Sequence, residues 1–485
     1  MKKHLKRHTF HWPKGLSWFY VWLFCSLIYV ALCGVSSQEG HDWGGDFAAY
    51  IMQGQAIAQG SWEILREQVV FRHDHSIPID SPEYYPWGFP LILSPFLGGS
   101  AIPWSGLKWL MVAWYVGTLG IFLKWAHDYL SDLSLVVLGM IWGLHPFMID
   151  FSHQIISDYP FLFFSMLSLY EMHRSLQEKG SNYLRMGIWV GLAILIRTQA
   201  WTLLPVLLLR LFWINEQGRW QLRPVFLPNR LLALLGLGGL WGLSGYLFPQ
   251  GRSYWSFFPE TSPWVVFQDM SVYYLKVTYK FFESWPSDHL FAIACQALLV
   301  VGIMVMAIRG LWLKRHRLSL GFIYSILTGG LLLLYPYKQG PRFIFTILMM
   351  CTLWMMVGGI RSWEKWILVL VAIVWISGSL WMNIQTSLKT DCIQGPLTEE
   401  SEAMWEFIEQ ELPKEATYVF YKPRVLTLMT GKKAVFATTP NYEAVVGDYL
   451  ITSQDSLQNF SPEAMAYVRQ LEVVYVSPNW KIWEK

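Results

Sequence analysis

The chain has 485 residues, of which 54% are hydrophobic and 15% charged, and its mean hydropathy is +0.31. This composition is more apolar than that of an ordinary soluble domain, and it indicates a membrane protein that crosses the bilayer several times. The net charge is +3 and the basic run MKKHLKRH at the N-terminus is short, so no nucleic-acid partner is expected.

Apolar runs recur along the chain at the length that a membrane-spanning helix requires. About 20 apolar residues cross a hydrocarbon core of about 30 Å as a helix, and helices rather than a barrel are expected here. The basic N-terminus leads into the first run without a small-residue cleavage site, which predicts a retained signal anchor. We predict about eleven spans, at residues 16–37, 104–124, 132–150, 158–173, 184–198, 200–214, 231–249, 289–309, 318–336, 342–359 and 365–384.

The charges in the loops predict the orientation of these spans. If the N-terminus is cytoplasmic, lysines and arginines gather in the inner loops, as the positive-inside rule requires. The loop at 38–87 is instead rich in acids, and Arg66 and Arg72 are its only basic residues apart from histidine. It is therefore predicted to lie on the extracytoplasmic side. An odd number of spans places residues 385–485 on that side as well.

The tail at 385–485 has the pattern of a small α+β domain. Residues 398–412 are predicted as a helix, and 416–421, 434–438 and 471–476 as strands. The segment 422–431 is predicted as a short helix, with Pro423 in its first turn and Gly431 at its end. We therefore expect a transmembrane catalytic domain at 1–384 and a soluble extracytoplasmic domain at 385–485.

The first candidate for chemistry is Asp46, which opens the stretch GGDFAAYIMQGQAIAQG. The apolar residues after it recur at helical spacing, while Gln53, Gln55 and Gln59 fall on other faces, which predicts a helix on the membrane surface. Asp46 suits the N-cap of such a helix. The same carboxylate could also face a cleft and accept a proton, so both interpretations stay open.

Two further acids are predicted on the same outer face. Glu83 lies in SPEYYPWGFPLILSPF, where prolines prevent a regular helix across Glu83–Phe89. The carboxylate either lines a cavity or is an incidental acid within an aromatic belt at the membrane interface. Asp158 begins a span, where it or Ser157 can cap the helix. Glu83 and Asp158 either shape the site or hold a divalent metal ion, which is a possible cofactor.

Three cations stand at predicted outer helix ends, where the positive-inside rule depletes them. They are Arg197, Lys338 and Arg342. Snorkelling to lipid head groups explains such positions. Binding of an anionic ligand such as a lipid phosphate explains them too, because the planar guanidinium can hold two oxygens at once.

Taken in order, these segments resemble a known family. GDFAAYIMQGQAIAQG, YYPWGFPLIL, ISDYPFLFFSMLSLY, GLAILIRTQAWTLLPVLLL and PRFIFTILMM are similar to bacterial members of the GT-C glycosyltransferase superfamily, over roughly residues 40–360. The protein O-mannosyltransferases and lipid A aminoarabinose transferases are the most similar group.

The resemblance implies a mannosyltransferase-like enzyme of the cell (inner) membrane, with an outward-facing site. Such an enzyme moves a sugar, with inversion, from a polyprenyl-phosphate donor to an acceptor that is a glycan, a lipid or a protein. It implies that Asp46 is the general base. It also implies that Arg197, Lys338 and Arg342 bind the donor phosphate.

Three other classes of function remain open. A membrane transporter or flippase for a lipid-linked or anionic substrate is the main alternative, although transporters place charges near the bilayer midplane, whereas the charges here gather at outer helix ends. A scaffold that displays 385–485 would not need Asp46. A polyprenyl-linked polymerase or ligase would share the lipid-phosphate site and differ in its acceptor.

Overall fold

The computed structural model describes most of the chain. The described residues are 18–79, 82–99, 101–176, 182–213, 228–251, 262–283, 290–359, 362–387, 393–438, 441–457 and 460–485. The predicted basic N-terminal segment, the acid Asp80 and most of the predicted inner loops at 174–183 and 215–230 lie outside these residues.

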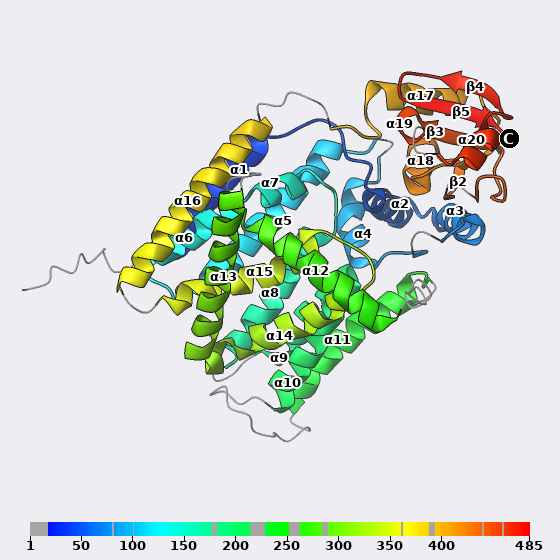
Figure 1. The fold of residues 1–485 in the computed structure, drawn as a ribbon. Coiled ribbons are helices and arrows are strands. Elements are labelled where there is room, and N and C mark those ends of the chain that lie inside the picture. The colour runs from blue at the N-terminus through cyan, green and yellow to red at the C-terminus, as the bar shows by residue number, and fades with distance from the viewer. Residues whose placement is uncertain are drawn as a thin grey trace, which may run out of the picture.

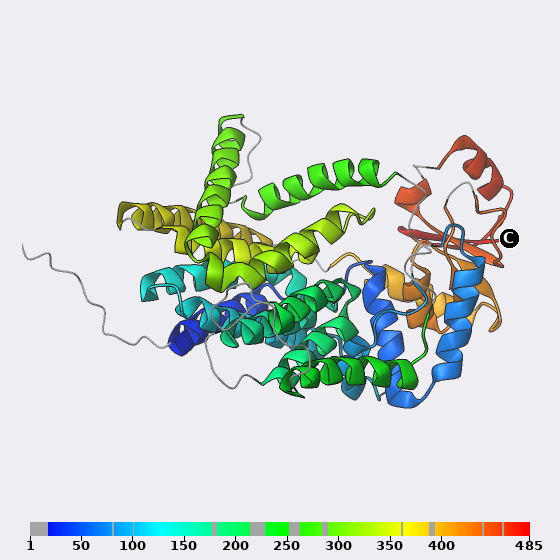
Figure 2. The same cartoon turned by 90° about the horizontal axis from the view of Figure 1, so that it is seen from below.

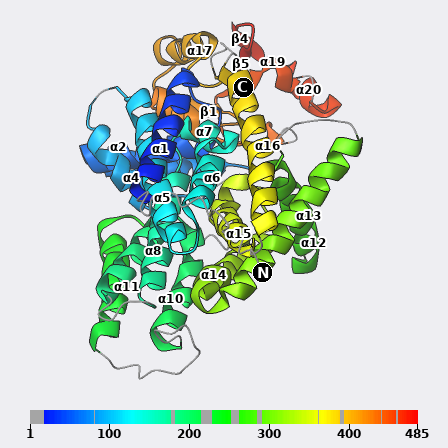
Figure 3. The ribbon, with the colours of Figure 1, turned by 90° about the vertical axis from the view of Figure 1, so that its left-hand side faces the viewer.

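A bundle of helices forms the body of the molecule (Figure 1). Figure 3 shows α16 beside α6 along one side of this bundle. The helices of the body are α1 (Trp18–Val35), α5 (Trp104–His127), α6 (Asp132–Gly143), α7 (Pro146–Ser152), α8 (Asp158–Arg174), α9 (Tyr183–Ile196), η2 (Thr198–Thr202), α10 (Leu203–Phe212), α11 (Pro228–Leu247), α12 (Pro263–Phe281), α13 (Leu290–Leu313), α14 (Arg315–Leu333), η4 (Pro341–Ile344), α15 (Phe345–Gly358) and α16 (Ser362–Ser387).

All eleven predicted spans coincide with helices of this body. Within the described residues, five helices are long and apolar enough to cross a membrane, and the pair α6 and α7, bent by 48°, would make a sixth. Four more predicted spans fall on shorter apolar helices, and the span 158–173 falls on α8, which is largely buried. α12 was not predicted as a helix, and it is not among the candidate spans.

Close backbone contacts hold several of these helices together. A Cβ atom added to Gly187 of α9 would lie 1.9 Å from the carbonyl oxygen of Ala233 in α11. One added to Gly310 of α13 would lie at the same distance from the carbonyl oxygen of Trp354 in α15. Small residues permit this approach, which is how helices pack tightly in a membrane.

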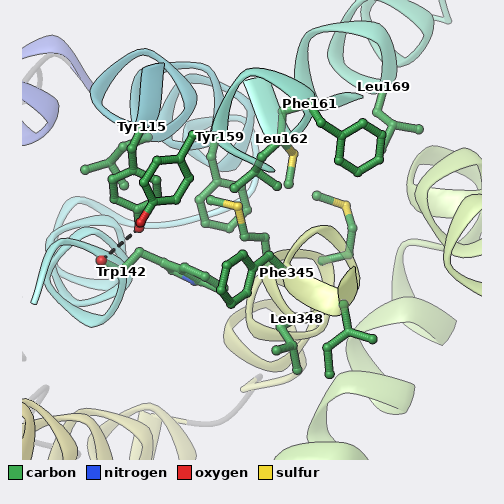
Figure 4. Close-up of a cluster of buried hydrophobic side chains, with 14 of the residues drawn as sticks. Tyr115, Trp142, Tyr159, Phe161, Leu162, Leu169, Phe345 and Leu348 are labelled. Atoms are coloured by element: carbon green, nitrogen blue, oxygen red, sulfur yellow. Dashed lines mark hydrogen bonds between the residues drawn. The ribbon is translucent and has the colours of Figure 1, made fainter. Parts of the chain in front are cut away.

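The core of the body is filled by aromatic and aliphatic side chains from α5, α6, α8 and α15 (Figure 4). Tyr115, Trp142 and Tyr159 are fully buried there. The Tyr115 hydroxyl donates a hydrogen bond of 2.8 Å to the Trp142 carbonyl, so its polar group is satisfied inside the apolar core. This packing fixes the helix ends that carry the candidate site.

The predicted outer loop at 38–87 is largely helical. It contains α2 (Gly45–Gln59) and α3 (Trp62–His75), and α4 (Gly88–Leu93) and η1 (Ser94–Phe96) follow it. The prediction that α2 lies on the membrane surface with polar faces is wrong in part. Gln53 is 2% exposed and forms hydrogen bonds with both the backbone nitrogen and the carbonyl of Tyr85. α2 is therefore packed into the protein on several sides.

The C-terminal domain is the predicted α+β fold. Its sheet has the order β2-β1-β3-β5-β4, with β1 parallel to β2 and β3, and β5 antiparallel to β3 and β4. The strands β3 and β5 were not predicted from the sequence. The elements are α17 (Glu399–Gln410), β1 (Thr417–Val419), α18 (Pro423–Thr430), β2 (Lys433–Val435), β3 (Tyr449–Ser453), α19 (Gln454–Leu457), α20 (Pro462–Val468), β4 (Glu472–Val476) and β5 (Trp480–Glu484).

This domain lies against the outer loop. Figures 1 and 2 show α2 and α3, in blue, beside the orange and red C-terminal elements. The backbone of Ile77 donates to the Phe436 carbonyl at 2.9 Å and accepts from the Thr438 amide at 3.1 Å. The loop and the tail therefore lie on the same side of the molecule, whatever the number of spans between them.

Candidate active site

Asp46 lies in the first turn of α2. The N-cap position belongs to Gly44 and carries no side-chain hydrogen bond, so the interpretation of Asp46 as the N-cap is wrong. The Asp46 side chain is 31% exposed. A carboxylate in the first turn is stabilised by the positive end of the helix dipole. Asp46 is therefore partly open to solvent, at a position that favours its ionised form.

Three side chains from distant parts of the chain surround this carboxylate. The Tyr85 hydroxyl donates a hydrogen bond of 2.7 Å to Oδ1. Arg342, in η4, lies 3.3 Å from Oδ2. Arg424, in α18 of the C-terminal domain, lies 3.7 Å from Oδ1 and donates a hydrogen bond of 2.8 Å to the Tyr85 hydroxyl. Both carboxylate oxygens thus face cations.

Asp158 lies at the start of α8 and shares one of these cations. Its Oδ2 lies 2.6 Å from Nη1 of Arg197, the C-cap of α9, and 3.8 Å from Nη1 of Arg342. Ser157 holds the N-cap position without a capping hydrogen bond, and its hydroxyl contacts Tyr50 at 2.8 Å and Arg197 at 3.3 Å. Arg342 therefore bridges two acids that were predicted to share one face.

The two arginines are held by the segment before α15. The Arg197 guanidinium lies 4.4 Å from the centre of the Phe343 ring, a cation–π distance. Arg342 donates hydrogen bonds to the carbonyl and to the side-chain oxygen of Gln339. Gly340 has a φ of 72°, and its amide donates to the Tyr273 hydroxyl at 2.6 Å. This irregular turn aims Arg342 at the acids.

The other two predicted site residues lie apart from this cluster. Lys338 is exposed, and its Nζ lies 5.8 Å from the centre of the Tyr273 ring. Glu83 lies 3.8 Å from Nδ1 of His73, in the last turn of α3. The structure therefore brings together Asp46, Asp158, Arg197 and Arg342, and pairs Glu83 with a different partner. The described residues contain no group of three His, Cys, Asp or Glu side chains that could hold a metal ion.

Comparison with known proteins agrees with this architecture. Residues 103–241 match the sequence profile of the family described as dolichyl-phosphate-mannose-protein mannosyltransferase. No curated protein sequence matches the chain.

Solved structures are similar over almost the whole chain. ArnT from Cupriavidus metallidurans bound to undecaprenyl phosphate aligns with a TM-score of 0.56 and 12% identity, covering 96% of this chain and 97% of that one. The oligosaccharyltransferase of Archaeoglobus fulgidus, tethered to an acceptor peptide, aligns with a TM-score of 0.57 and 10% identity, covering 95% of this chain and 73% of that one. The chain has the fold of the GT-C glycosyltransferases. The predicted fold class is thereby confirmed.

In this GT-C fold, the electrostatic surroundings of Asp46 favour its ionised form. Burial raises the pKa of a carboxyl group. For Asp46 that effect is outweighed by the guanidinium groups of Arg424 and Arg342, the hydrogen bond from Tyr85 and the more distant Arg197, so the pKa is lowered. Asp46 therefore carries a negative charge at neutral pH and can accept a proton.

Two residues of this cluster, Tyr85 and Arg424, were not among the predicted site residues. Tyr85 lies in the segment YYPWGF, whose proline predicts irregular backbone but gives no indication of the role of the hydroxyl. Arg424 lies in the predicted short helix of the tail, 378 positions after Asp46. Gly45 is consistent with this contact, because a side chain there would meet the Arg424 guanidinium, but the glycine does not identify its partner in the sequence.

Proposed function

We propose that the protein is an inverting glycosyltransferase that moves a sugar from a polyprenyl-phosphate donor to an acceptor on the outer face of the membrane. One observation carries this proposal. The ionised Asp46 lies in one cluster with Arg342 and Arg197 at the helix ends. A base and a phosphate-binding pair side by side are what such a transfer requires.

The proposed reaction is a single displacement. The acceptor hydroxyl attacks the anomeric carbon of the donor while Asp46 takes the hydroxyl proton. The bond between that carbon and the phosphate oxygen breaks, and polyprenyl phosphate leaves with the bonding electrons. Arg197 and Arg342 stabilise the charge that develops on the leaving phosphate, because a guanidinium can bind two of its oxygens. Attack opposite the leaving group inverts the anomeric configuration.

The remaining predicted site residues have supporting roles in this proposal. Asp158 holds Arg197 and Arg342 toward the site through its ion pairs. Lys338 is exposed on the segment that also carries Arg342, so it attracts the donor phosphate as it approaches. Glu83 shapes the outer wall beside His73.

The proposed location is the cell membrane, with the N-terminus in the cytoplasm and the site outside. We assign catalysis to residues 1–384 with their outer loop, and an extracytoplasmic position to residues 385–485. The contacts of the tail with α2 and α3 support one shared face.

The family profile names a dolichyl-phosphate-mannose donor, and ArnT binds undecaprenyl phosphate, which supports a polyprenyl-phosphate donor here. The acceptor is a glycan, a lipid or a protein.

A transfer assay separates this proposal from a transporter or flippase for a lipid-linked substrate. Purified protein in lipid nanodiscs is given a polyprenyl-phosphate donor labelled in its sugar. A transferase cleaves the donor when a membrane extract supplies the acceptor, so free polyprenyl phosphate forms in step with transfer of the label to a glycan, lipid or protein acceptor. A flippase would leave the label attached to the lipid and, in proteoliposomes, would change only the leaflet in which the intact donor lies. That second result would overturn the proposal.

A further inference from the structure

Arg424 connects the C-terminal domain to the candidate base. Its side chain is 10% exposed and lies over the Tyr85 ring, 5.3 Å from the ring centre. Nη1 donates to the Tyr85 hydroxyl at 2.8 Å, and that hydroxyl donates to Asp46 Oδ1 at 2.7 Å. The guanidinium therefore acts on Asp46 directly, as a charge 3.7 Å away, and through the tyrosine.

The start of α2 is shaped to receive this guanidinium. A Cβ atom built on Gly45 would lie 3.2 Å from Nη2 and 3.4 Å from Nε of Arg424, tighter than an ordinary van der Waals contact. Arg424 thus lies close against the backbone at the residue before Asp46. The two glycines before the acid are thereby partly explained, since a larger residue at Gly45 would push the guanidinium away.

The C-terminal domain is anchored on both sides of this contact. Trp43 packs against aromatic rings of the domain, with its ring centre 5.2 Å from that of Trp480 and 5.7 Å from that of Tyr421. Ile77, at the other end of the outer loop, forms a bridge with Ala437 next to β2. These contacts fix α18 relative to α2. The position of Arg424 beside Asp46 is therefore set by the packing of the two domains.

Arg424 also changes the charge of the cluster. Asp46 and Asp158 carry two negative charges and Arg197 and Arg342 carry two positive ones, so these four groups balance. Adding Arg424 gives three positive and two negative charges, a formal sum of +1. If a donor phosphate were to pair with Arg197 and Arg342, Arg424 would remain as a counter-charge of Asp46.

We infer that the C-terminal domain supplies Arg424 as a positioning residue of the active site, which holds Asp46 ionised and oriented toward the acceptor. This inference rests on the proposed function. It assigns the tail a direct part in the reaction, and it predicts that acceptor activation depends on the tail while donor binding does not.

The charged and titratable groups that face Asp46 come from several elements. Together they set the pKa of Asp46, which determines the acidic limb of the pH–rate profile. They are Arg424 of α18, Arg342 of η4, Arg197 after α9, Tyr85 before α4, Tyr50 of α2 and Tyr335 after α14. Of these, Arg424 is the one contributed by the C-terminal domain. Replacing it with a neutral residue removes one cation from Asp46, so the acidic limb of the pH–rate profile moves to higher pH.

The test compares Arg424→Gln, Arg424→Lys and the exposed control Arg469→Gln in the full-length protein, with polyprenyl-phosphate sugar as the donor. We expect Arg424→Gln to lower turnover by about tenfold to a hundredfold, the usual effect of losing a hydrogen bond to a charged group. Its acidic limb moves to higher pH and its donor affinity stays within about twofold of the wild type. Arg424→Lys recovers part of the turnover because it keeps the charge.

Unchanged turnover and pH profile in Arg424→Gln, with an active wild type, would overturn the inference and leave the proposed function standing. An inactive wild type would instead overturn the proposed function. If Arg424→Gln does not fold, Gly45→Ala decides the matter, because the added Cβ displaces the Arg424 guanidinium and leaves the side chains that contact Asp46 unchanged. Its acidic limb must also move to higher pH, and a wild-type limb would count against the inference.

Discussion

The ion pair between Arg197 and Asp158 gives a quantitative prediction about stability. The side chains are 12% and 3% exposed, and their charged atoms are 2.6 Å apart. Arg197→Gln removes the cation and leaves a buried carboxylate behind. Breaking one side of a buried pair typically costs about 3–5 kcal/mol, because the remaining charge is not solvated.

Arg342 reduces this cost. At an effective dielectric constant of about 20, the attraction of Asp158 is about 6 kcal/mol to Arg197 at 2.6 Å and about 4 kcal/mol to Arg342 at 3.8 Å. The second cation stays in place in the variant, so the lower end of the range applies. We expect Arg197→Gln to lower the free energy of unfolding by about 3 kcal/mol.

The double variant Asp158→Asn, Arg197→Gln carries neither charge and should recover at least half of this loss of stability.

Lys433→Gln is the matched control. It breaks an ion pair with Glu67 that has the same 2.6 Å distance but is 34% and 66% exposed. Such a surface pair is worth about 1 kcal/mol or less. Unfolding is followed in detergent micelles by heat and by denaturant. An Arg197→Gln protein as stable as Lys433→Gln, or a double variant no better than the single one, would refute the reasoning.

Two further predictions concern ligand binding and packing at the site. Arg342→Gln should weaken donor binding by about tenfold to a hundredfold, since it loses a charge-assisted contact. The exposed control Lys338→Gln should change donor binding by about threefold or less. Equal effects of the two variants in a donor titration would contradict the assigned roles. Gly45→Ala places a Cβ 3.2 Å from Arg424 and should lower turnover while the protein stays folded; wild-type turnover in this variant would show that the close contact does not matter.

Much of this architecture could be predicted because it depends on local patterns. Apolar runs of sufficient length located the helices of the body other than α12, and Pro423 and Gly431 marked the ends of α18. The convergence of Asp46, Asp158, Arg197 and Arg342 could be anticipated because each lies at a helix end on one predicted face. Charged side chains at such helix ends are stabilised when they pair with one another or with a charged ligand.

What the sequence did not reveal depends on contacts between distant segments. Arg424 reaches Asp46 across 378 positions, and no periodicity reports such a pairing. Glu83 was grouped with the other outer acids, but α3 presents His73 to it instead, and this helix was not predicted. α2 was predicted as a surface helix because its glutamines fall on different faces. The pairing of Gln53 with the Tyr85 backbone satisfies one of those polar groups inside the protein.

The measurement that tests the central claim most directly is turnover of a labelled polyprenyl-phosphate sugar by Asp46→Asn at matched donor binding. Asparagine keeps an oxygen that can accept the Tyr85 hydrogen bond but cannot take a proton at neutral pH. The exposed acid Glu63 of the same outer loop provides the control, Glu63→Gln. We predict that Asp46→Asn binds the donor and releases no sugar, while Glu63→Gln behaves as the wild type. Undiminished release of sugar by Asp46→Asn would contradict the assignment of Asp46 as the catalytic base.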